Sequence, residues 1–234
     1  MNKEQFILEI EKLGLVLSEK QLEQLQNYYE LLIEWNKVMN LTGITEIEQV
    51  YLKHFYDSLT ICKVIDLNNE SNLCDIGTGA GFPGMVLKIC FPHLNVTLVD
   101  SLQKRLDFLN EVIEKLQLTN IKTVHERAED YAKEVRDCYD VVTVRAVANL
   151  NILVEYCLPL IKPNKYFIAM KGNISQEIEN LPKALNVISG NIVKNETFLL
   201  PYENSTRSII VISKEQKTDK KYPRKYSEIK KKPL

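Results

Sequence analysis

The sequence predicts an α/β fold, with a predominantly parallel, twisted sheet that is covered by helices on both faces. Three observations lead to this prediction. Short apolar runs alternate with helical segments from residue 71 onward. These runs are continuous, which is typical of parallel strands buried on both faces. The first run ends in a glycine-rich turn, as the first strand of a doubly wound sheet often does.

The residues before this core have helical periodicity. From Ser18, a candidate N-cap with Gln21 three residues later, apolar side chains recur every three or four positions. Residues 53–65 (KHFYDSLTICKVI) form a second amphipathic segment. We therefore expect an N-terminal helical cap that packs on the core. The cap either covers a ligand pocket or serves as scaffold only.

The core is expected to alternate strands and helices. Apolar runs predict strands at 72–76, 96–99, 121–124, 141–144, 166–170 and 209–212. Helices are predicted at 83–90, 102–116, 150–158 and 174–185. This order favours a doubly wound sheet over separate helical and strand layers.

Charge is distributed unevenly along the chain. The 30 basic and 31 acidic residues give a net charge of −1, but residues 214–234 alone carry +6 and residues 1–213 carry −7. A basic end on an acidic body favours a polyanionic partner that is bound through phosphate contacts. The alternative is a solvated tail. We divide the chain into a cap (1–70), a core (71–213) and a basic tail (214–234).

Several classes of protein are excluded by composition. No apolar run approaches the roughly 20 residues of a membrane helix, and glutamates occupy the N-terminal region where a signal peptide would be apolar. Five cysteines without a CxxC pair are typical of buried thiols in a reducing compartment. The three histidines lie far apart and form no metal motif. We expect a cytoplasmic protein without a metal centre.

A glycine-rich turn follows the first predicted strand, in the sequence DIGTGAGFPG at 75–84. Gly77, Gly79 and Gly81 allow a tight turn and close approach of a ligand to the backbone. Asp100 closes the second strand, where an acidic side chain can accept hydrogen bonds from both ribose hydroxyls. The pattern predicts a nucleoside-containing cofactor at the carboxyl ends of the strands.

Two cofactors fit this loop. Residues 79–84 (GAGFPG) match the dinucleotide pattern G-x-G-x-x-G. Asp75, just before the loop, would repel a pyrophosphate, whereas S-adenosylmethionine has no phosphate and carries an ammonium and a sulfonium. The residues favour S-adenosylmethionine, with a dinucleotide or a turn without ligand as alternatives.

The third and fourth strands also end in candidate site residues. Ala128 and Glu129 would lie beside the adenine, although Glu129 can equally be an acid that stabilises a helix N-terminus. The fourth strand ends in Arg145 and Ala146, near the methyl donor. Because an unpaired buried charge is costly, Arg145 needs an anionic partner: Asp75, a cofactor carboxylate or an RNA phosphate. A purely structural ion pair is the alternative.

A set of motifs runs from residue 35 to the C-terminus: WNKVMNLTGIT, HFYDSL, CDIGTGAGFPG, VTLVDSLQKRLDFL, RAE, YDVVTVRAVANL, MKG, and KYPRK followed by KKPL. With these motifs in this order, the chain resembles the RsmG (glucose-inhibited division protein B) family of ribosomal small-subunit RNA methyltransferases. The combination is specific, whereas the glycine-rich loop alone would indicate only a superfamily.

The resemblance implies a Rossmann-like S-adenosylmethionine-dependent methyltransferase fold. It also implies methyl transfer to N7 of one guanine in 16S ribosomal RNA, as free RNA or in the small ribosomal subunit, by a monomer. The family's cofactor contacts fall on Gly77, Phe82, Ala128, Glu129 and Arg145. Our loop, charge and ribose arguments add Gly79, Asp75 and Asp100.

The implied chemistry needs no general base, because guanine N7 is a lone-pair acceptor exposed on the base edge. Catalysis would consist of positioning. We hypothesise that Arg145 and Lys171, at neighbouring strand ends, hold an RNA phosphate or guanine O6. The basic tail, with Tyr222 and Tyr226, offers phosphate contacts and base stacking. We expect removal of residues 214–234 to weaken RNA binding and to flatten its salt dependence.

Two alternatives belong to other functional classes. An NAD-linked oxidoreductase would need a hydride-handling His or Tyr–Lys pair, which the motifs do not supply. A noncatalytic RNA-binding module could retain the cofactor fold. Competition by NADH tests the first alternative, and methyl incorporation into RNA tests the second.

Overall fold

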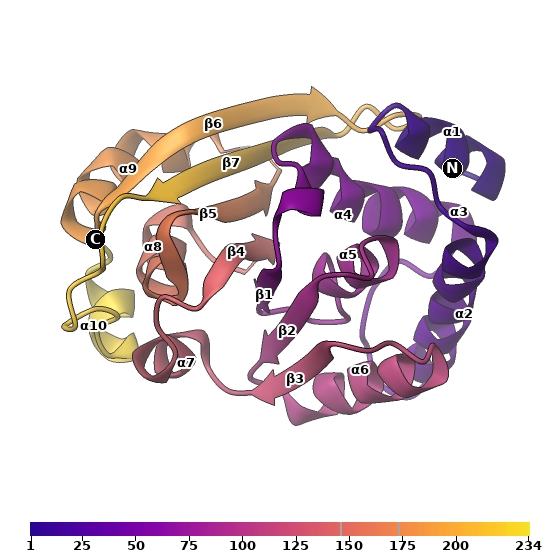
Figure 1. Ribbon diagram of the computed structural model, residues 1–234, viewed down its shortest axis with the longest axis horizontal. Helices are drawn as coiled ribbons and strands as arrows, with labels where there is room; N and C mark the ends of the chain where they lie inside the picture. Colours follow the sequence, from indigo (N-terminus) through magenta and orange to yellow (C-terminus); the bar gives the residue numbers. More distant parts are fainter. Residues whose placement is uncertain (146, 173) are drawn as a thin grey trace.

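The computed structural model describes residues 1–145, 147–172 and 174–234, so that Ala146 lies outside the described residues. Its centre is a seven-stranded sheet with the order β3-β2-β1-β4-β5-β7-β6 (Figure 1). The strands are β1 (Asn72–Ile76), β2 (Asn95–Asp100), β3 (Ile121–His125), β4 (Tyr139–Arg145), β5 (Ile161–Lys171), β6 (Gly190–Leu199) and β7 (Thr206–Lys214). The pairs among β1 to β5 are parallel, and β7 runs antiparallel to both β5 and β6. The predicted fold class is confirmed.

The helices precede the sheet, connect its strands or, in the case of α10, follow the last strand. They are α1 (Lys3–Glu11), α2 (Glu19–Asn36), α3 (Ile47–Val50), α4 (Asp57–Leu59), α5 (Gly84–Cys90), α6 (Gln103–Lys115), α7 (Ala128–Glu134), α8 (Leu150–Cys157), α9 (Ser175–Ile188) and α10 (Tyr226–Lys231). A π-helical turn (Tyr51–Tyr56) joins α3 to α4, and 3₁₀ turns cover Thr60–Lys63, Leu67–Asn69 and Leu158–Leu160. The segment predicted as one helix at 53–65 is therefore a succession of three helical types.

Within the core (71–213), the strand β6 and the helix α7 were not predicted from the sequence. The strand β6 lies at the edge of the sheet and alternates half-buried with exposed residues, so that it lacks the continuous apolar run of a central strand. The helix α7 (AEDYAKE) has Tyr131 as its single large apolar side chain, so it shows no apolar stripe with helical spacing. Both elements form in spite of a weak local pattern, because the rest of the sheet is there to pack against.

The N-terminal helices are fixed to the core by polar contacts as well as by packing. Ser18 caps α2 as predicted, with Gln21 N donating to Ser18 Oγ at 3.3 Å and Ser18 N donating to Gln21 Oε1 at 2.9 Å. The amide of the same Gln21 donates to the carbonyls of Ile89 and Cys90, at 2.9 and 3.0 Å. The capping residue thus also joins α2 to the last turn of α5.

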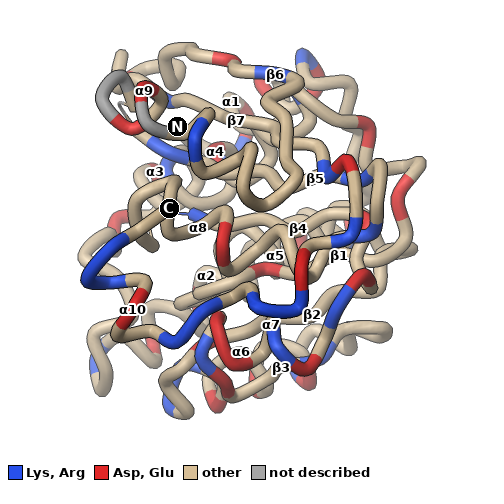
Figure 2. The backbone as a smooth tube through the Cα atoms, turned by 90° about the vertical axis from the view of Figure 1, so that its left-hand side faces the viewer, with Lys and Arg blue, Asp and Glu red and all other residues tan. Residues whose placement is uncertain are grey.

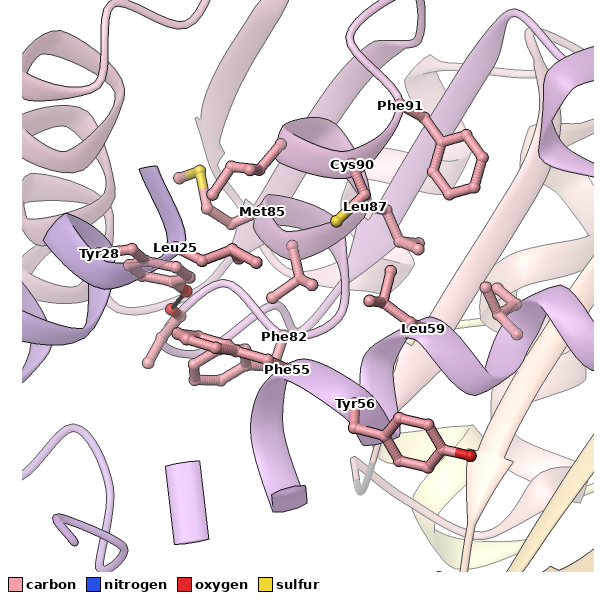
Figure 3. Packing of buried hydrophobic residues seen from close by; sticks show 14 of the residues in the cluster. Leu25, Tyr28, Phe55, Tyr56, Leu59, Phe82, Met85, Leu87, Cys90 and Phe91 are labelled. Carbon is pink, nitrogen blue, oxygen red and sulfur yellow. Dashed lines mark hydrogen bonds between the residues drawn. The ribbon is translucent and has the colours of Figure 1, made fainter. Parts of the chain in front are cut away.

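The sheet separates two hydrophobic cores. The helices α1 to α6 lie on one side of it and α7 to α10 on the other (Figure 1). In the first core, Tyr28 of α2 packs against Phe55 and Phe82, with ring centroids 5.7 and 5.5 Å away (Figure 3). The Tyr28 hydroxyl also donates to the carbonyl of Ala80. The N-terminal helices therefore contact the glycine-rich loop directly.

The C-terminal segment is docked on the second core. Lys214 is fully buried and donates to Asp137 Oδ1 at 2.5 Å and to the Ile161 carbonyl at 2.7 Å. Tyr222 and Ile229 are buried in the same core as α8 and α9. The alternative of a wholly solvated tail is wrong for these residues.

No helix in the described ranges is long and apolar enough to cross a membrane. Within the same part of the chain, no three His, Cys, Asp or Glu side chains are grouped in a way that could hold a metal ion.

Candidate active site

A cavity of about 770 Å³ opens at the carboxyl ends of β1, β2, β3 and β4. We call it the first cavity. It lies where the strand order reverses between β1 and β4, the usual ligand position in a doubly wound sheet. Seven of the predicted site residues line it: Gly77, Gly79, Phe82, Asp100, Ala128, Glu129 and Arg145.

Backbone geometry explains the glycines of the loop. Gly77 has φ +67°, and a Cβ at this position would lie 2.7 Å from Cγ2 of Val147. Gly79 has φ +60°, in the left-handed region that favours glycine. The amides of Gly77 and Thr78 donate to the carbonyl of Val99, at 2.8 and 3.1 Å. The loop is thereby folded over the end of β2 and presents its backbone to the cavity.

Asp100 forms a buried acidic wall of the cavity. Its Oδ2 accepts from Gly79 N at 2.9 Å and from Arg105 Nη1 at 3.3 Å, while Oδ1 accepts from Leu102 N at 2.9 Å. The carboxylate is held at the carboxyl end of β2, as predicted. Glu129 is a second buried carboxylate of the first cavity, at the start of α7. Its position is compatible with both roles expected from the sequence, contact with an adenine and stabilisation of the N-terminus of α7.

Asp75 does not line the first cavity. The structure therefore does not have the direct cofactor contact that the sequence predicted for this residue. The side chain is fully buried behind the loop, where Oδ2 accepts from Thr78 Oγ1 at 2.7 Å and from Gly84 N at 2.8 Å. Burial raises the pKa of Asp75 to about 7. Among the described residues, Oδ1 has no hydrogen-bond partner. Asp75 holds the loop in place, and its charge lies one layer behind the cavity wall.

The anionic partner of Arg145 is Asp57, a residue that the sequence analysis did not consider. Arg145 Nη1 donates to Asp57 Oδ2 at 3.1 Å and to the Lys53 carbonyl at 2.8 Å. Its Nη2 donates to Nδ1 of His54 at 3.2 Å, and the guanidinium lies 5.2 Å from the ring centroid of Phe82. The end of β4 is thus joined to the N-terminal helices by an ion pair that also faces the cavity.

His54 is a site residue that sequence reasoning missed. Its ring stacks on Phe82 with a centroid distance of 4.4 Å, and its Nε2 bonds to Thr42 Oγ1 at 2.9 Å. Burial, and secondarily the charge of Arg145, lower the pKa of His54 to about 3. The imidazole is therefore neutral at pH 7. His54 lies in the HFYDSL motif and Thr42 in the WNKVMNLTGIT motif, so these motifs were the sequence feature that could have indicated both residues.

A second cavity of about 280 Å³ adjoins the first and shares Arg145 and His54 with it. We call it the second cavity. Four basic side chains line it: Lys53, Arg145, Lys171 and Arg207. Asp57 is the acid opposite them, and it also accepts from Arg207 Nε at 3.0 Å. Lys53 and Lys171 are also paired with Glu203 and Glu177, so that four cations meet three carboxylates and the second cavity keeps a small excess of positive charge.

Lys171 belongs to the second cavity and does not line the first. Arg145 and Met170 are paired across β4 and β5, so Arg145 and Lys171 end neighbouring strands, as predicted. Lys171 Nζ donates to Glu177 Oε2 at 2.8 Å and to the Ala148 carbonyl at 2.5 Å. Both basic side chains are thus held in place by acids from other elements.

Within the basic tail, the structure separates residues that are exposed from those that are not. Tyr222 is buried, so the base stacking predicted for it is wrong, whereas Tyr226 lines the first cavity together with Lys230. The buried Lys214 is not free to contact phosphate. Figure 2 marks the basic residues of this segment, several of which are exposed: Lys217, Lys220, Lys221, Lys225, Lys230, Lys231 and Lys232. Deleting residues 214–234 would also remove core packing, so substitution of exposed lysines tests RNA binding more cleanly.

Comparisons with known proteins agree with this geometry. Residues 21–205 match the GidB family, described as rRNA small subunit methyltransferase G. Proteins named ribosomal RNA small subunit methyltransferase G from Bacillus thuringiensis (strain Al Hakam) and Bacillus anthracis (strain CDC 684 / NRRL 3495) are each 54% identical to the chain over 228 residues, covering 96% of this chain and 95% of the relative.

Solved structures share the fold at low sequence identity. A SAM-dependent methyltransferase from Aquifex aeolicus has a TM-score of 0.56 at 14% identity, covering 75% of this chain and 97% of that one. A 16S rRNA (adenine(1408)-N(1))-methyltransferase mutant from Catenulisporales acidiphilia, solved with SAM, has a TM-score of 0.53 at 16% identity and covers 64% of this chain and 87% of that one. At such identities the likeness shows the fold alone.

Proposed function

This chain belongs to the GidB family, rRNA small subunit methyltransferase G, and from that premise we propose that it methylates N7 of a specific guanine in 16S ribosomal RNA. The family makes it an S-adenosylmethionine-dependent rRNA methyltransferase. The atom, the base and the residues that act on them are the proposal. The observation that carries it is the position of Arg145, which lines a cavity suited to the cofactor and a basic cavity suited to RNA.

The residues of the first cavity fit S-adenosylmethionine. The loop of Gly77 and Gly79 presents its backbone to the cavity, and a Cβ at Gly77 would collide with the Val147 side chain that also lines it. Asp100 offers a carboxylate for the ribose hydroxyls, and Ala128 and Glu129 lie where the adenine is expected. When bound, the cofactor supplies a methyl group on a cationic sulfur. Ionised Asp75, behind the loop, would favour that positive charge.

The second cavity is the proposed entrance for the acceptor RNA. Its basic side chains can neutralise phosphates, which is the main source of affinity in nucleic-acid binding. Arg145 and Lys171 are proposed to hold a phosphate or guanine O6. Each is already fixed, Arg145 by Asp57 and Lys171 by Glu177. Fixed donors lose little freedom when the substrate arrives, so they suit a positioning role.

The reaction needs no proton acceptor at the attacking atom. Guanine N7 carries a lone pair and attacks without first losing a proton. This agrees with the state of His54, whose two ring nitrogens are bonded to Arg145 and Thr42. With a pKa of about 3, His54 holds Arg145 and Phe82 in position and is not poised to accept a proton at pH 7. Alignment of the reactants can supply several kcal/mol of the barrier reduction.

We keep the division into a cap (1–70), a core (71–213) and a tail (214–234) as part of the proposal. The cap supplies His54 to both cavities, and the tail supplies Tyr226 to the first. Because ribosomal RNA is the acceptor, we also propose that the enzyme works in the cytoplasm.

The test is methyl transfer from radiolabelled S-adenosylmethionine to unmodified 16S RNA, as free RNA and in 30S particles. Products are mapped by strand cleavage specific for N7-methylguanine. A single cleaved guanine is the expected result, and RNA already methylated there should accept no label. Label that resists this cleavage would refute the N7 assignment. Absence of label in both substrates, with cofactor binding confirmed by calorimetry, would refute methyl transfer to this RNA.

A further inference from the structure

The C-terminal helix α10 forms part of the wall of the first cavity. Tyr226 and Lys230 line the cavity together with Glu129 and Tyr156. The guanidinium of Arg127, which immediately precedes α7, lies 5.5 Å from the ring centroid of Tyr226. The basic tail and the residues expected at the adenine therefore meet at one end of the cavity.

The position of α10 is fixed by buried polar anchors. Glu155 of α8 is fully buried and accepts from Arg224 N, Nε and Nη2, at 2.8, 2.9 and 2.7 Å. Arg136 donates to the carbonyls of Tyr222 and Thr218, both at 2.7 Å. An ionised carboxylate in such a buried position is tolerated when it is paired and hydrogen-bonded. The segment that leads into α10 is thus held on the same helix that supplies Tyr156 to the cavity.

Tyr226 has the chemistry and the accessibility of a ligand contact. Its side chain keeps 45% of its surface exposed although Ile229, on the same helix, is fully buried. An aromatic ring at the wall of a nucleoside cavity offers a base a flat apolar surface. Lys230 Nζ lies 5.9 Å from the Tyr226 ring centroid, so a cation neighbours the ring there as well as at Arg127.

We propose that α10 belongs to the cofactor site, with Tyr226 contacting the adenine ring of S-adenosylmethionine. The inference rests on the proposed function, because it takes the same cofactor in the same cavity. It assigns the tail a part in cofactor binding in addition to the RNA contacts expected from its charge. Cofactor affinity then depends on a segment about 80 residues beyond Arg145, the last residue that the sequence predicted to contact the cofactor.

The test compares Tyr226→Ala and Tyr226→Phe with the unaltered chain by calorimetry, without RNA. The two ligands are S-adenosylmethionine and 5′-methylthioadenosine, which lacks the amino-acid end. Because stacking on an aromatic side chain contributes to base binding, Tyr226→Ala should weaken both ligands about tenfold. Tyr226→Phe keeps the ring and should stay within about twofold of the unaltered chain. Tyr202→Ala is the matched control, since Tyr202 is similarly exposed but does not line the cavity.

Each outcome decides the inference. Equal losses for the two ligands support it, because the lost contact then belongs to the adenosine moiety. Affinities for both ligands that stay within about twofold in Tyr226→Ala would overturn it while leaving the proposed function intact. Failure of the unaltered chain to bind S-adenosylmethionine would overturn both. Melting temperatures of the variants show that the comparison is made between folded chains.

Discussion

The two cavities adjoin each other but differ in the charges that are buried in their walls. In the first cavity the carboxylates of Asp100 and Glu129 are buried, whereas the cations that line it keep part of their surface exposed: Arg105, Arg127, Arg145 and Lys230. The second is lined by four basic side chains, with Asp57 as the acid among them. One cavity therefore offers acceptors to the hydroxyls of a nucleoside, and the other offers cations to a polyanion. The proposed division of cofactor and RNA between the cavities rests on the two buried carboxylates of the first.

The wall between the cavities explains how opposite preferences can lie so close together. Arg145 faces both cavities and is paired with Asp57, so its charge is locally balanced. His54 lies beside it and, with its lowered pKa, adds no second charge at pH 7. Phe82 covers one face of each group. Arg145, backed by the apolar ring of Phe82, thus lies between the proposed cofactor cavity and the proposed RNA cavity.

The largest expected effect comes from Arg145→Ala, which removes the cation of the shared wall. Methyl transfer should fall about a thousandfold, because positioning and electrostatic stabilisation are lost together. RNA affinity should fall and cofactor affinity should change little, since the glycine loop and Asp100 remain. Asp57 keeps Arg207 as a partner, so the chain should fold. Single-turnover methylation and calorimetry measure the two effects. Unchanged methylation would show that Arg145 is purely structural.

Asp100→Asn tests the acidic character of the first cavity. Replacing the carboxylate weakens its charge-assisted hydrogen bonds with the ribose, so the Kd for S-adenosylmethionine should rise about a hundredfold. RNA affinity should be unaffected. Asp107→Asn, at an exposed position in the helix that follows, is the control. Equal cofactor affinities of the two variants would contradict the ribose role.

Asp75→Asn tests how much negative charge lies behind the first cavity. Folding raises the pKa of Asp75 from 3.8 to about 7, so between these values the folded chain holds a proton that the unfolded chain releases. The contribution of Asp75 to the free energy of unfolding of the wild type therefore falls as the pH rises from about 4 to about 7. The Asp75→Asn variant has no titrating group at this position. Its free energy of unfolding relative to wild type should therefore increase by about 2 kcal/mol between pH 5 and pH 8. Denaturant unfolding measures this. Parallel pH profiles would mean that Asp75 is ionised throughout.

The smallest effect is expected for Lys171→Ala, which removes one cation from the second cavity only. RNA affinity should fall about tenfold, and the slope of log affinity against log salt should decrease by about one, as for the loss of one phosphate contact. Cofactor affinity should not change. Lys183→Ala, at an exposed position of α9, is the control. A change in cofactor affinity without a change in salt slope would place Lys171 with the first cavity instead.

The sequence by itself was sufficient for the fold class and for the position of the first cavity. Continuous apolar runs predicted β1 to β5, Ser18 and Gln21 predicted the start of α2, and the loop before α5 predicted the cradle. Each of these features depends on residues that are close together in the chain. A strand shows its burial in its own apolar run, a capping pair is three residues apart, and a tight turn needs glycine at fixed positions. The motifs also sufficed to indicate the family.

Contacts between side chains that are far apart in the chain depend on the tertiary fold and were not predicted. Arg145 and Asp57 are 88 residues apart, and Arg224 and Glu155 are 69 apart, so no local pattern pairs them. The same holds for Asp75, which was expected to complement the charge of the cofactor and is instead buried behind the glycine-rich loop. Spacing along the chain fixes the strand end at which a residue lies. Whether its side chain faces a ligand, an ion-pair partner or the core depends on elements that arrive from elsewhere in the fold.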